Sequence, residues 1–207
     1  MKMLAFDTCL DKTYITLSDG ERFENKIILS NEKNYHSAYL ISSIVEILKN
    51  NNLEPKDLDY IAIDIGPGSF TGIRACTTVA RMLAQQLNIK TIGVSSLEIL
   101  SRILNENDLV ALDARKNKAY LFDGKILGAV ELEEVDKIIT NRRVITDSGL
   151  YERFSALASE TINYQLKEYP LGEILAKIAY EKIACGVDMD WRKLKPLYIQ
   201  PPPVFGR

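Results

Sequence analysis

Residues 64–74 of this 207-residue chain read Asp-Ile-Gly-Pro-Gly-Ser-Phe-Thr-Gly-Ile-Arg, a stretch that joins an apolar strand to a long helix. The residues before it, Tyr60–Ile65, are rich in β-branched side chains, and Ser69 is placed to cap a helix over Phe70–Leu87. Glycines at such a turn either allow close packing of the helix or let backbone amides approach a phosphate. The turn matches neither the P-loop nor the dinucleotide-binding pattern, so both interpretations stay open.

The rest of the first hundred residues places this turn inside an α/β domain. Their pattern predicts strand, strand, strand, helix, strand, helix, strand and helix, with Asp19-Gly20 as a hairpin turn between the second and third strands. An antiparallel meander followed by alternating elements implies a mixed sheet covered by helices. Besides the strand and helix around the turn, the expected elements are strands at Lys2–Asp7, Thr13–Asp19, Arg22–Leu29 and Lys90–Val94, and helices at Tyr35–Asn50 and Ser96–Leu104.

The second half repeats the meander in degraded form. Asn105–Asp108 is the most polar stretch in mid-chain, so we expect a boundary there, with subdomains at residues 1–104 and 109–190 and an extended tail at 191–207. The tail contains Pro201-Pro202-Pro203, which favours a polyproline conformation. The expected elements are strands at Leu109–Asp113, Lys118–Phe122, Lys125–Glu131 and Val144–Thr146, and helices at Glu133–Thr140, Tyr151–Ala158 and Leu171–Cys185.

This order of elements resembles the ribonuclease-H-like unit, which is duplicated in the sugar kinase–actin superfamily. The predicted fold class is therefore α/β, with two ribonuclease-H-like, actin-like subdomains of which the second is reduced.

Composition excludes several functional classes. The net charge is −2, and the longest run without a charged residue has only twelve residues, at 34–45, whereas a membrane span needs roughly 20 apolar residues. The single histidine, His36, excludes zinc sites that need a histidine pair. The three cysteines, Cys9, Cys76 and Cys185, lie far apart in sequence, which predicts a reducing compartment and no thiolate metal cluster. We expect no metal and no cofactor.

A small set of residues is a candidate for weak nucleotide binding. Asp7 and Thr8 follow the first strand, and Gly66 and Gly68 lie in the strand-to-helix turn. The chain contains no Gly-Gly pair, whereas ATPases of this fold use glycine-rich loops in their second half. ATP hydrolysis is therefore not expected, and each of these residues also has a simple structural explanation.

Two helices carry more apolar residues than one core-facing stripe needs. In Phe70–Leu87, Ala75 and Met82 lie on a second face beside the polar line Arg74, Thr78, Arg81 and Gln85. In Tyr35–Asn50 the core stripe is predicted at Ile41, Ile44, Val45 and Leu48, which leaves Tyr39, Leu40 and Ile47 as surplus. Such helices are either buried within the monomer or paired with a partner's helices.

Several segments together resemble the TsaB (YeaZ) family, bacterial subunits of tRNA threonylcarbamoyladenosine biosynthesis. The segments are Leu4–Thr8, His36-Ser37, Gly66–Arg74, Asp113-Ala114-Arg115 with Tyr120, and Pro196-Leu197-Tyr198. They occur in the family's order, and Gly66–Arg74 is the most specific of them. The resemblance implies a non-catalytic relative of TsaD, the subunit that transfers the threonylcarbamoyl group to tRNA. TsaD carries an H-x-x-x-H metal site, of which His36 matches the first histidine while Leu40 occupies the place of the second.

The resemblance further implies a cytoplasmic scaffold that dimerises with a TsaD-like paralogue, self-associates as a homodimer and meets a TsaE-like ATPase through the complex. It implies only indirect contact with tRNA and none with a membrane. The alternatives are a weak nucleotide-binding module and a glycoprotease-like metallopeptidase. The residues expected at the partner interface are His36, Tyr39, Leu40, Ser43, Ile47, Thr71, Arg74, Ala75, Thr78, Arg81, Met82 and Gln85.

Overall fold

The chain folds into two compact units, each built around its own sheet. In the computed structural model, which describes residues 1–29, 39–104, 108–187 and 190–200, the first unit comprises Met1–Ser96 and Pro170–Leu197. The second comprises Leu97–Tyr169 together with the residues from Tyr198 onward.

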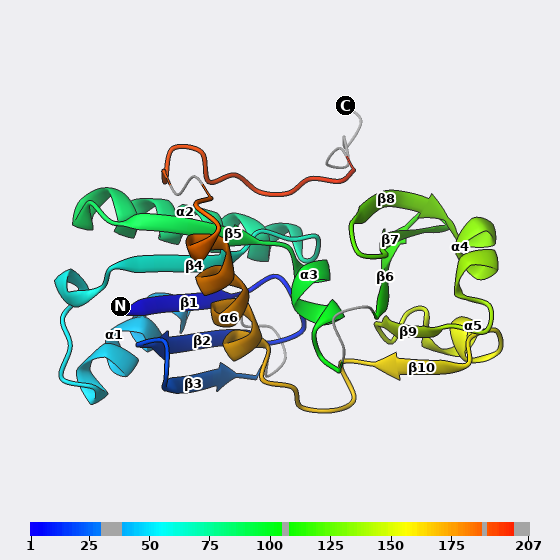
Figure 1. The fold of residues 1–207 in the computed structure, drawn as a ribbon, viewed down its shortest axis with the longest axis horizontal. Coiled ribbons are helices and arrows are strands. Elements are labelled where there is room, and N and C mark those ends of the chain that lie inside the picture. The colour runs from blue at the N-terminus through cyan, green and yellow to red at the C-terminus, as the bar shows by residue number, and fades with distance from the viewer. Residues whose placement is uncertain (30–38, 105–107, 188–189, 201–207) are drawn as a thin grey trace. The chain divides into compact units, whose positions relative to one another are not determined.

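The sheet of the first unit has five strands in the order β3-β2-β1-β4-β5 (Figure 1). The first three strands form the antiparallel meander, and β1 also pairs in parallel with β4, which pairs in parallel with β5. Leu4 lies opposite Leu17 on one side and Ile61 on the other. The strands are β1 (Met3–Asp7), β2 (Thr13–Ser18), β3 (Phe23–Ile28), β4 (Tyr60–Asp64) and β5 (Lys90–Val94).

Helices cover both faces of this sheet. One core cluster joins Phe6, Ile15 and Ile63 of the strands to apolar residues of α1 (Leu40–Asn50) and α2 (Phe70–Leu87), so these two helices share a face. Helix α6 (Leu171–Ala184) crosses all five strands on the opposite face, in front of the sheet in Figure 1. One short element, η2 (Pro55–Asp57), completes the unit. Helix α3 (Ser96–Ser101) begins at the last residue before the division, and its other residues belong to the second unit.

The second unit repeats this topology with smaller helices. Its strand order, β8-β7-β6-β9-β10, matches that of the first sheet strand for strand. Its helices are only 8 and 5 residues long, so the reduction predicted from sequence lies in the helices and not in the sheet. The elements are β6 (Leu109–Arg115), β7 (Lys118–Phe122), β8 (Ile126–Glu131), α4 (Leu132–Ile139), β9 (Arg143–Thr146), α5 (Tyr151–Ser155) and β10 (Glu160–Asn163). No helix in the described part of the chain is both long and apolar enough to cross a membrane.

The predicted fold class, two ribonuclease-H-like α/β subdomains, is confirmed, and two details differ. Strand β10 was not predicted, because its four residues give little periodicity. The final helix lies on the first sheet and not in the second subdomain, because its buried residues, including Leu175 and Ala179, pack on the first unit. The predicted polyproline segment at Pro201–Pro203 lies outside the described residues.

The core face of α1 also differs from the predicted one. Leu40, Ser43 and Ile47 are buried together with Ile44 and Leu48, whereas Ile41 and Val45 are exposed. The two possible stripes share Ile44 and Leu48 and differ by a rotation of one residue, about 100°. The apolar side chains left on the surface of α1 are therefore Ile41 and Val45, and Leu40 and Ile47 belong to the unit's own core.

Because α6 packs on the first unit, truncating its buried residue Leu175 should destabilise that unit. Leu175→Ala should lower the free energy of unfolding by about 2–5 kcal/mol, because Leu175 is fully buried. Urea denaturation followed by Trp191 fluorescence reports on this unit, since Trp191, the chain's one tryptophan, packs against its core.

Leu166→Ala is the matched control, because Leu166 is 75% exposed and its truncation should change stability by less than about 0.5 kcal/mol. If Leu175→Ala left the urea concentration of the Trp191 transition unchanged, the packing of α6 on the first sheet would be contradicted.

Candidate functional site

Three segments of the first unit meet at one edge of its sheet. Because β1, β4 and β5 run parallel, their carboxyl ends lie side by side, and the residues that follow each strand converge there. Asp7 ends β1, Asp64 ends β4, and Ser96 follows β5. All three residues are polar and all three are buried, since none is more than 2% exposed.

The two carboxyl groups are held by short local hydrogen bonds. Asp7 Oδ1 accepts from the backbone N–H of Cys9, and Asp64 Oδ1 accepts from that of Gly66 at 2.6 Å. The Ser96 hydroxyl lies 2.7 Å from both oxygens of Asp64. The second oxygen of Asp7 has no hydrogen-bond partner within the described structure.

Burial controls the charge of this pair. Burial raises the pKa of Asp7 to about 8, with the nearby Cys76 thiol adding to the rise and the Cys9 N–H opposing it. Burial and the neighbouring Asp7 carboxyl raise the pKa of Asp64 well above its usual range, against the Ser96 hydrogen bond. Burial therefore disfavours the charged form of both carboxyls in the folded unit.

The glycines of the strand-to-helix turn allow the backbones to approach closely. A Cβ at Gly68 would lie 2.4 Å from the carbonyl oxygen of Cys9, and one at Gly72 would lie 1.8 Å from that of Thr8. The Ser69 N–H donates to Cys9 O at 2.8 Å, and the Thr8 hydroxyl donates to Gly72 O at 2.7 Å. These contacts fasten the start of α2 to the turn after β1.

Of the four predicted nucleotide residues, only Gly68 is exposed. Asp7 and Thr8 are each 2% exposed and Gly66 is buried, so these groups face the interior of the unit. The structure thus favours the first of the two interpretations of the turn, close packing of the helix. Ser69 also caps α2 as predicted, since its side chain accepts from the Gly72 N–H.

The second unit carries the same pair of aspartates in a more open setting. Asp113 Oδ1 accepts from the N–H of Arg115 and Asp147 Oδ1 from that of Gly149, two residues on in each case, as in the first unit. The N–H of Asp113 donates to Asp147 Oδ2 at 2.7 Å. Arg115 forms the local ion pair with Asp113, at 3.0 Å. Both aspartates are half-buried, so this copy of the loop geometry is partly solvated.

The predicted partner-interface residues fall into four groups. Six are exposed: Tyr39, Thr71, Arg74, Thr78, Met82 and Gln85. Ala75 and Arg81 are half-buried, Leu40, Ser43 and Ile47 are buried in the unit's own core, and His36 lies outside the described residues. The three buried side chains are not available to a partner, which corrects the prediction at those positions.

The outer surface of α2 is ordered by stacking contacts. The Arg74 guanidinium lies 4.0 Å from the centre of the Phe70 ring, and that of Arg81 lies 5.8 Å from the Trp191 ring. Such cation–π contacts favour a fixed orientation of the arginine. The exposed residues Thr71, Arg74, Thr78, Met82 and Gln85 follow helical spacing and form one continuous stripe.

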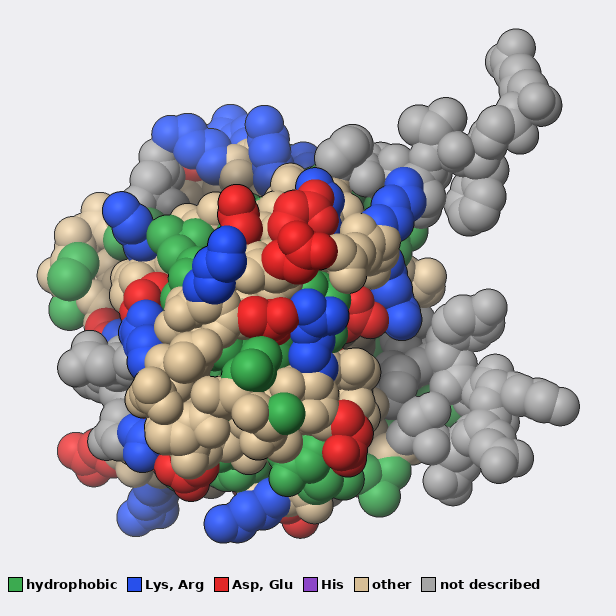
Figure 2. Space-filling view, turned by 90° about the vertical axis from the view of Figure 1, so that its right-hand side faces the viewer, with side chains coloured by type: hydrophobic (Ala, Val, Ile, Leu, Met, Phe, Trp, Pro, Cys, Tyr) green, Lys and Arg blue, Asp and Glu red, His purple; other side chains and the backbone are tan. Residues whose placement is uncertain are grey.

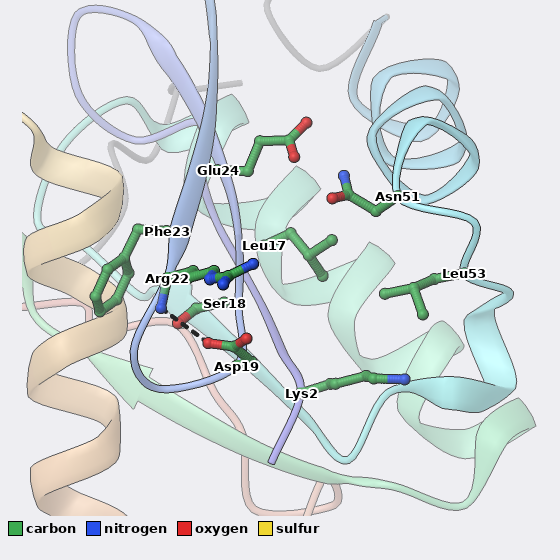
Figure 3. Close-up of a pocket in the computed structure, with 9 residues that line it drawn as sticks. All are labelled: Lys2, Leu17, Ser18, Asp19, Arg22, Phe23, Glu24, Asn51 and Leu53. Atoms are coloured by element: carbon green, nitrogen blue, oxygen red, sulfur yellow. Dashed lines mark hydrogen bonds between the residues drawn. The ribbon is translucent and has the colours of Figure 1, made fainter.

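A surface cavity of about 550 Å³ lies elsewhere on the first unit, between the β2–β3 hairpin and the chain that leaves α1 (Figure 3). Leu17 and Leu53 face each other across it, and charged side chains of both signs surround them. Asp19 is already used by the hairpin turn, since it accepts from the N–H groups of Glu21 and Arg22. The sequence analysis missed this cavity because its lining comes from three separate segments.

Comparison with known proteins supplies independent information. A family model described as "TsaD: tRNA N6-adenosine threonylcarbamoyltransferase" matches residues 27–185. Proteins called tRNA threonylcarbamoyladenosine biosynthesis protein TsaB are similar to this chain: one from Buchnera aphidicola subsp. Schizaphis graminum is 32% identical over 126 residues, and one from Bacillus subtilis is 34% identical over 123. These matches cover 57% and 58% of this chain, and they span 58% and 53% of the relatives' own length.

Among solved structures, YeaZ from Pseudomonas aeruginosa superimposes with a TM-score of 0.77 at 22% identity. The match covers 95% of this chain and 99% of that one, which shows the same fold over nearly the whole length of both.

The close approach at Gly72 predicts a reversal of the usual effect of alanine in a helix. Gly→Ala inside a helix normally stabilises by about 0.5–1 kcal/mol, but the new Cβ of Gly72→Ala would overlap Thr8 O. The variant should lose at least about 2 kcal/mol of unfolding free energy in urea denaturation. Thr71→Ala, one residue away on the exposed side, should lose little unfolding free energy. If Gly72→Ala were as stable as the wild-type protein, this packing would be refuted.

The buried carboxyl pair predicts a stability that falls as pH rises. The pKa of Asp7 is about 8 in the folded unit against an ordinary 3.8, so between these values the folded protein keeps a proton that the unfolded chain releases. The free energy of unfolding should then decrease by up to about 1.4 kcal/mol per pH unit for this group. Asp7→Asn, which cannot ionise, should flatten the decline in urea melts in metal-free buffer. An equal decline in wild type and variant would argue against the protonated pair.

Proposed function

The chain belongs to the TsaD family, in its TsaB/YeaZ branch, and from this premise we propose that it is a non-catalytic subunit of the machinery that forms threonylcarbamoyladenosine in tRNA. Its relatives are named for that biosynthesis, and the chain covers just over half of the length of those it matches. The role of this protein is to pair with a TsaD-like relative and hold it in a productive state.

The observation that carries the proposal is the outer surface of α1 and α2. Both helices pack on the same face of the first sheet, so their outer surfaces point to the same side of the unit. On α1 this surface carries Ile41 and Val45, which are 51% and 41% exposed, and on α2 it carries Met82, which is 45% exposed. Exposed apolar residues on two neighbouring helices suit the helices of a partner in a bundle.

A relative of the same fold is the partner that best suits this surface. A TsaD-like chain would present equivalent helices, and a second copy of this chain would present the same ones, which is the homodimer expected from the resemblance. Polar residues along the α2 stripe, such as Arg74 and Gln85, would surround the apolar contacts. Activation requires that the partner's productive state bind this surface more tightly than its other states do.

Two features support a role without catalysis. Leu40, in the place of a second metal-binding histidine, is fully buried in the core, where it contributes packing. The Asp7–Asp64 pair is buried, whereas catalytic carboxylates must reach a substrate.

The surface charge of the second unit supports indirect contact with tRNA. Acidic and basic side chains are intermixed on the face shown in Figure 2. Several arginines of this unit are paired with aspartates, as Arg142 is with Asp123 and Arg153 with Asp136. Tight binding of a nucleic-acid backbone relies on basic side chains that meet phosphates. In the proposed complex, TsaD would contact the tRNA, and a TsaE-like ATPase would join the complex, all in the cytoplasm.

Charge reversal on the proposed surface tests the pairing. Val45→Glu combined with Met82→Glu places two carboxylates among apolar contacts and should weaken binding to TsaD from the same organism by about 30-fold or more. Isothermal titration calorimetry measures the affinity, and circular dichroism checks that the fold is kept, because both side chains are exposed.

Leu166→Glu is the control, because it adds a carboxylate at an exposed leucine of the second unit. Normal pairing by the double variant, or equal loss by the control, would exclude the α1–α2 surface as the interface.

A further inference from the structure

Three side chains that commonly bind metals meet inside the first unit. Asp7 and Cys9 come from the turn after β1, and Cys76 comes from the second turn of α2. Their ligand atoms, one carboxylate oxygen and two sulfurs, all lie within 4.8 Å of one another. Each of the three residues is at most 2% exposed. The sequence separates Cys9 from Cys76 by 67 positions, which is why the sequence analysis expected no thiolate cluster.

The carboxylate of Asp7 is incompletely satisfied. Its Oδ1 accepts the Cys9 N–H, while its Oδ2 is buried and has no hydrogen-bond partner in the described part of the structure. A buried polar atom without a partner costs free energy, and a bound cation would remove that cost. This oxygen is an observation independent of the two sulfurs.

Thr8 holds the side chain of Cys76 in place. The backbone N–H of Thr8 donates to Cys76 Sγ at 3.1 Å, and the Thr8 hydroxyl oxygen lies at the same distance. A hydrogen bond from a backbone N–H to a ligand sulfur orients it. Thr8 is itself fixed, because its hydroxyl donates to Gly72 O at 2.7 Å.

We propose that Asp7, Cys9 and Cys76 form a structural Zn²⁺ site. Two thiolates and a carboxylate are ligands that zinc accepts, and the borderline-soft metal favours sulfur over the oxygen-only sets of Mg²⁺ and Ca²⁺. Thr8 Oγ1 is the candidate for the fourth position. Binding releases the two thiol protons, and that of Asp7, to solvent, because only the deprotonated groups coordinate. The bound metal would tie the turn after β1 to α2, beside the glycine contacts.

This site does not depend on the proposed role in tRNA modification, and it differs from the H-x-x-x-H site of TsaD, since none of its ligands lies at His36 or Leu40. Cys185 provides an internal reference. It is exposed at the end of α6 and takes no part in the cluster.

Titration of the full-length, reduced protein with Co²⁺, a spectroscopic substitute for Zn²⁺, tests the proposal. We expect a thiolate-to-cobalt charge-transfer band that saturates at a single equivalent and disappears when Zn²⁺ displaces the cobalt. Zn²⁺ at roughly 100 times its Kd should also raise the melting temperature by about 5–10 °C. Absence of the band and of the thermal shift in the wild-type protein would overturn the proposal.

Three variants locate the site. Cys9→Ser and Cys76→Ser should each abolish the band and the thermal shift, while Cys185→Ser should retain both. Loss of the signal in Cys185→Ser, or its retention in the other two, would assign the metal to the surface and overturn the proposal.

If either serine variant fails to fold, alkylation of wild-type protein in mild denaturant replaces it. Zn²⁺ should slow the modification of Cys9 and Cys76 but not of Cys185, as read by mass spectrometry of peptides. Equal modification of all three cysteines with and without Zn²⁺ would overturn the proposal.

Discussion

Backbone contact between the start of α2 and the turn after β1 leaves no space for a side chain at Gly72. Three hydrogen bonds accompany this contact, from Ser69 N–H, the Thr8 hydroxyl and Thr8 N–H. Because α2 is 18 residues long, fixing its first turn sets the direction of the whole helix. The position of its outer stripe therefore depends on a contact made at the opposite side of the helix.

The same contact explains why polar groups are buried at the carboxyl ends of the strands. The helix closes over Asp7 and Asp64, and burial then raises the pKa of both carboxyls. In the second unit the equivalent aspartates, Asp113 and Asp147, keep the same local turns but stay half-buried. The same loop geometry thus occurs in two environments, and in the first unit it serves packing.

Local patterns in the sequence predicted most of the fold. The boundaries of α2, β5 and β7 agree with the predicted ones residue for residue, because strong periodicity and clear turn residues flank them. The errors arose where tertiary contacts decide: α6 joins the first sheet, and the core face of α1 is rotated by one residue. Within the site, Asp64, Ser96 and Cys76 could not be linked to Asp7 from sequence, since only the parallel strand order brings them together.

We propose that this protein acts through a partner and not through a site of its own. Reconstituted tRNA modification tests it most directly: TsaD, TsaE, the threonylcarbamoyl-adenylate-forming enzyme, tRNA, threonine, bicarbonate and ATP are combined with and without this protein, and modified adenosine is measured by mass spectrometry. The account predicts modified adenosine only when the protein is present, and none when the protein replaces TsaD. Equal modification without the protein, or modification by the protein in the absence of TsaD, would contradict it.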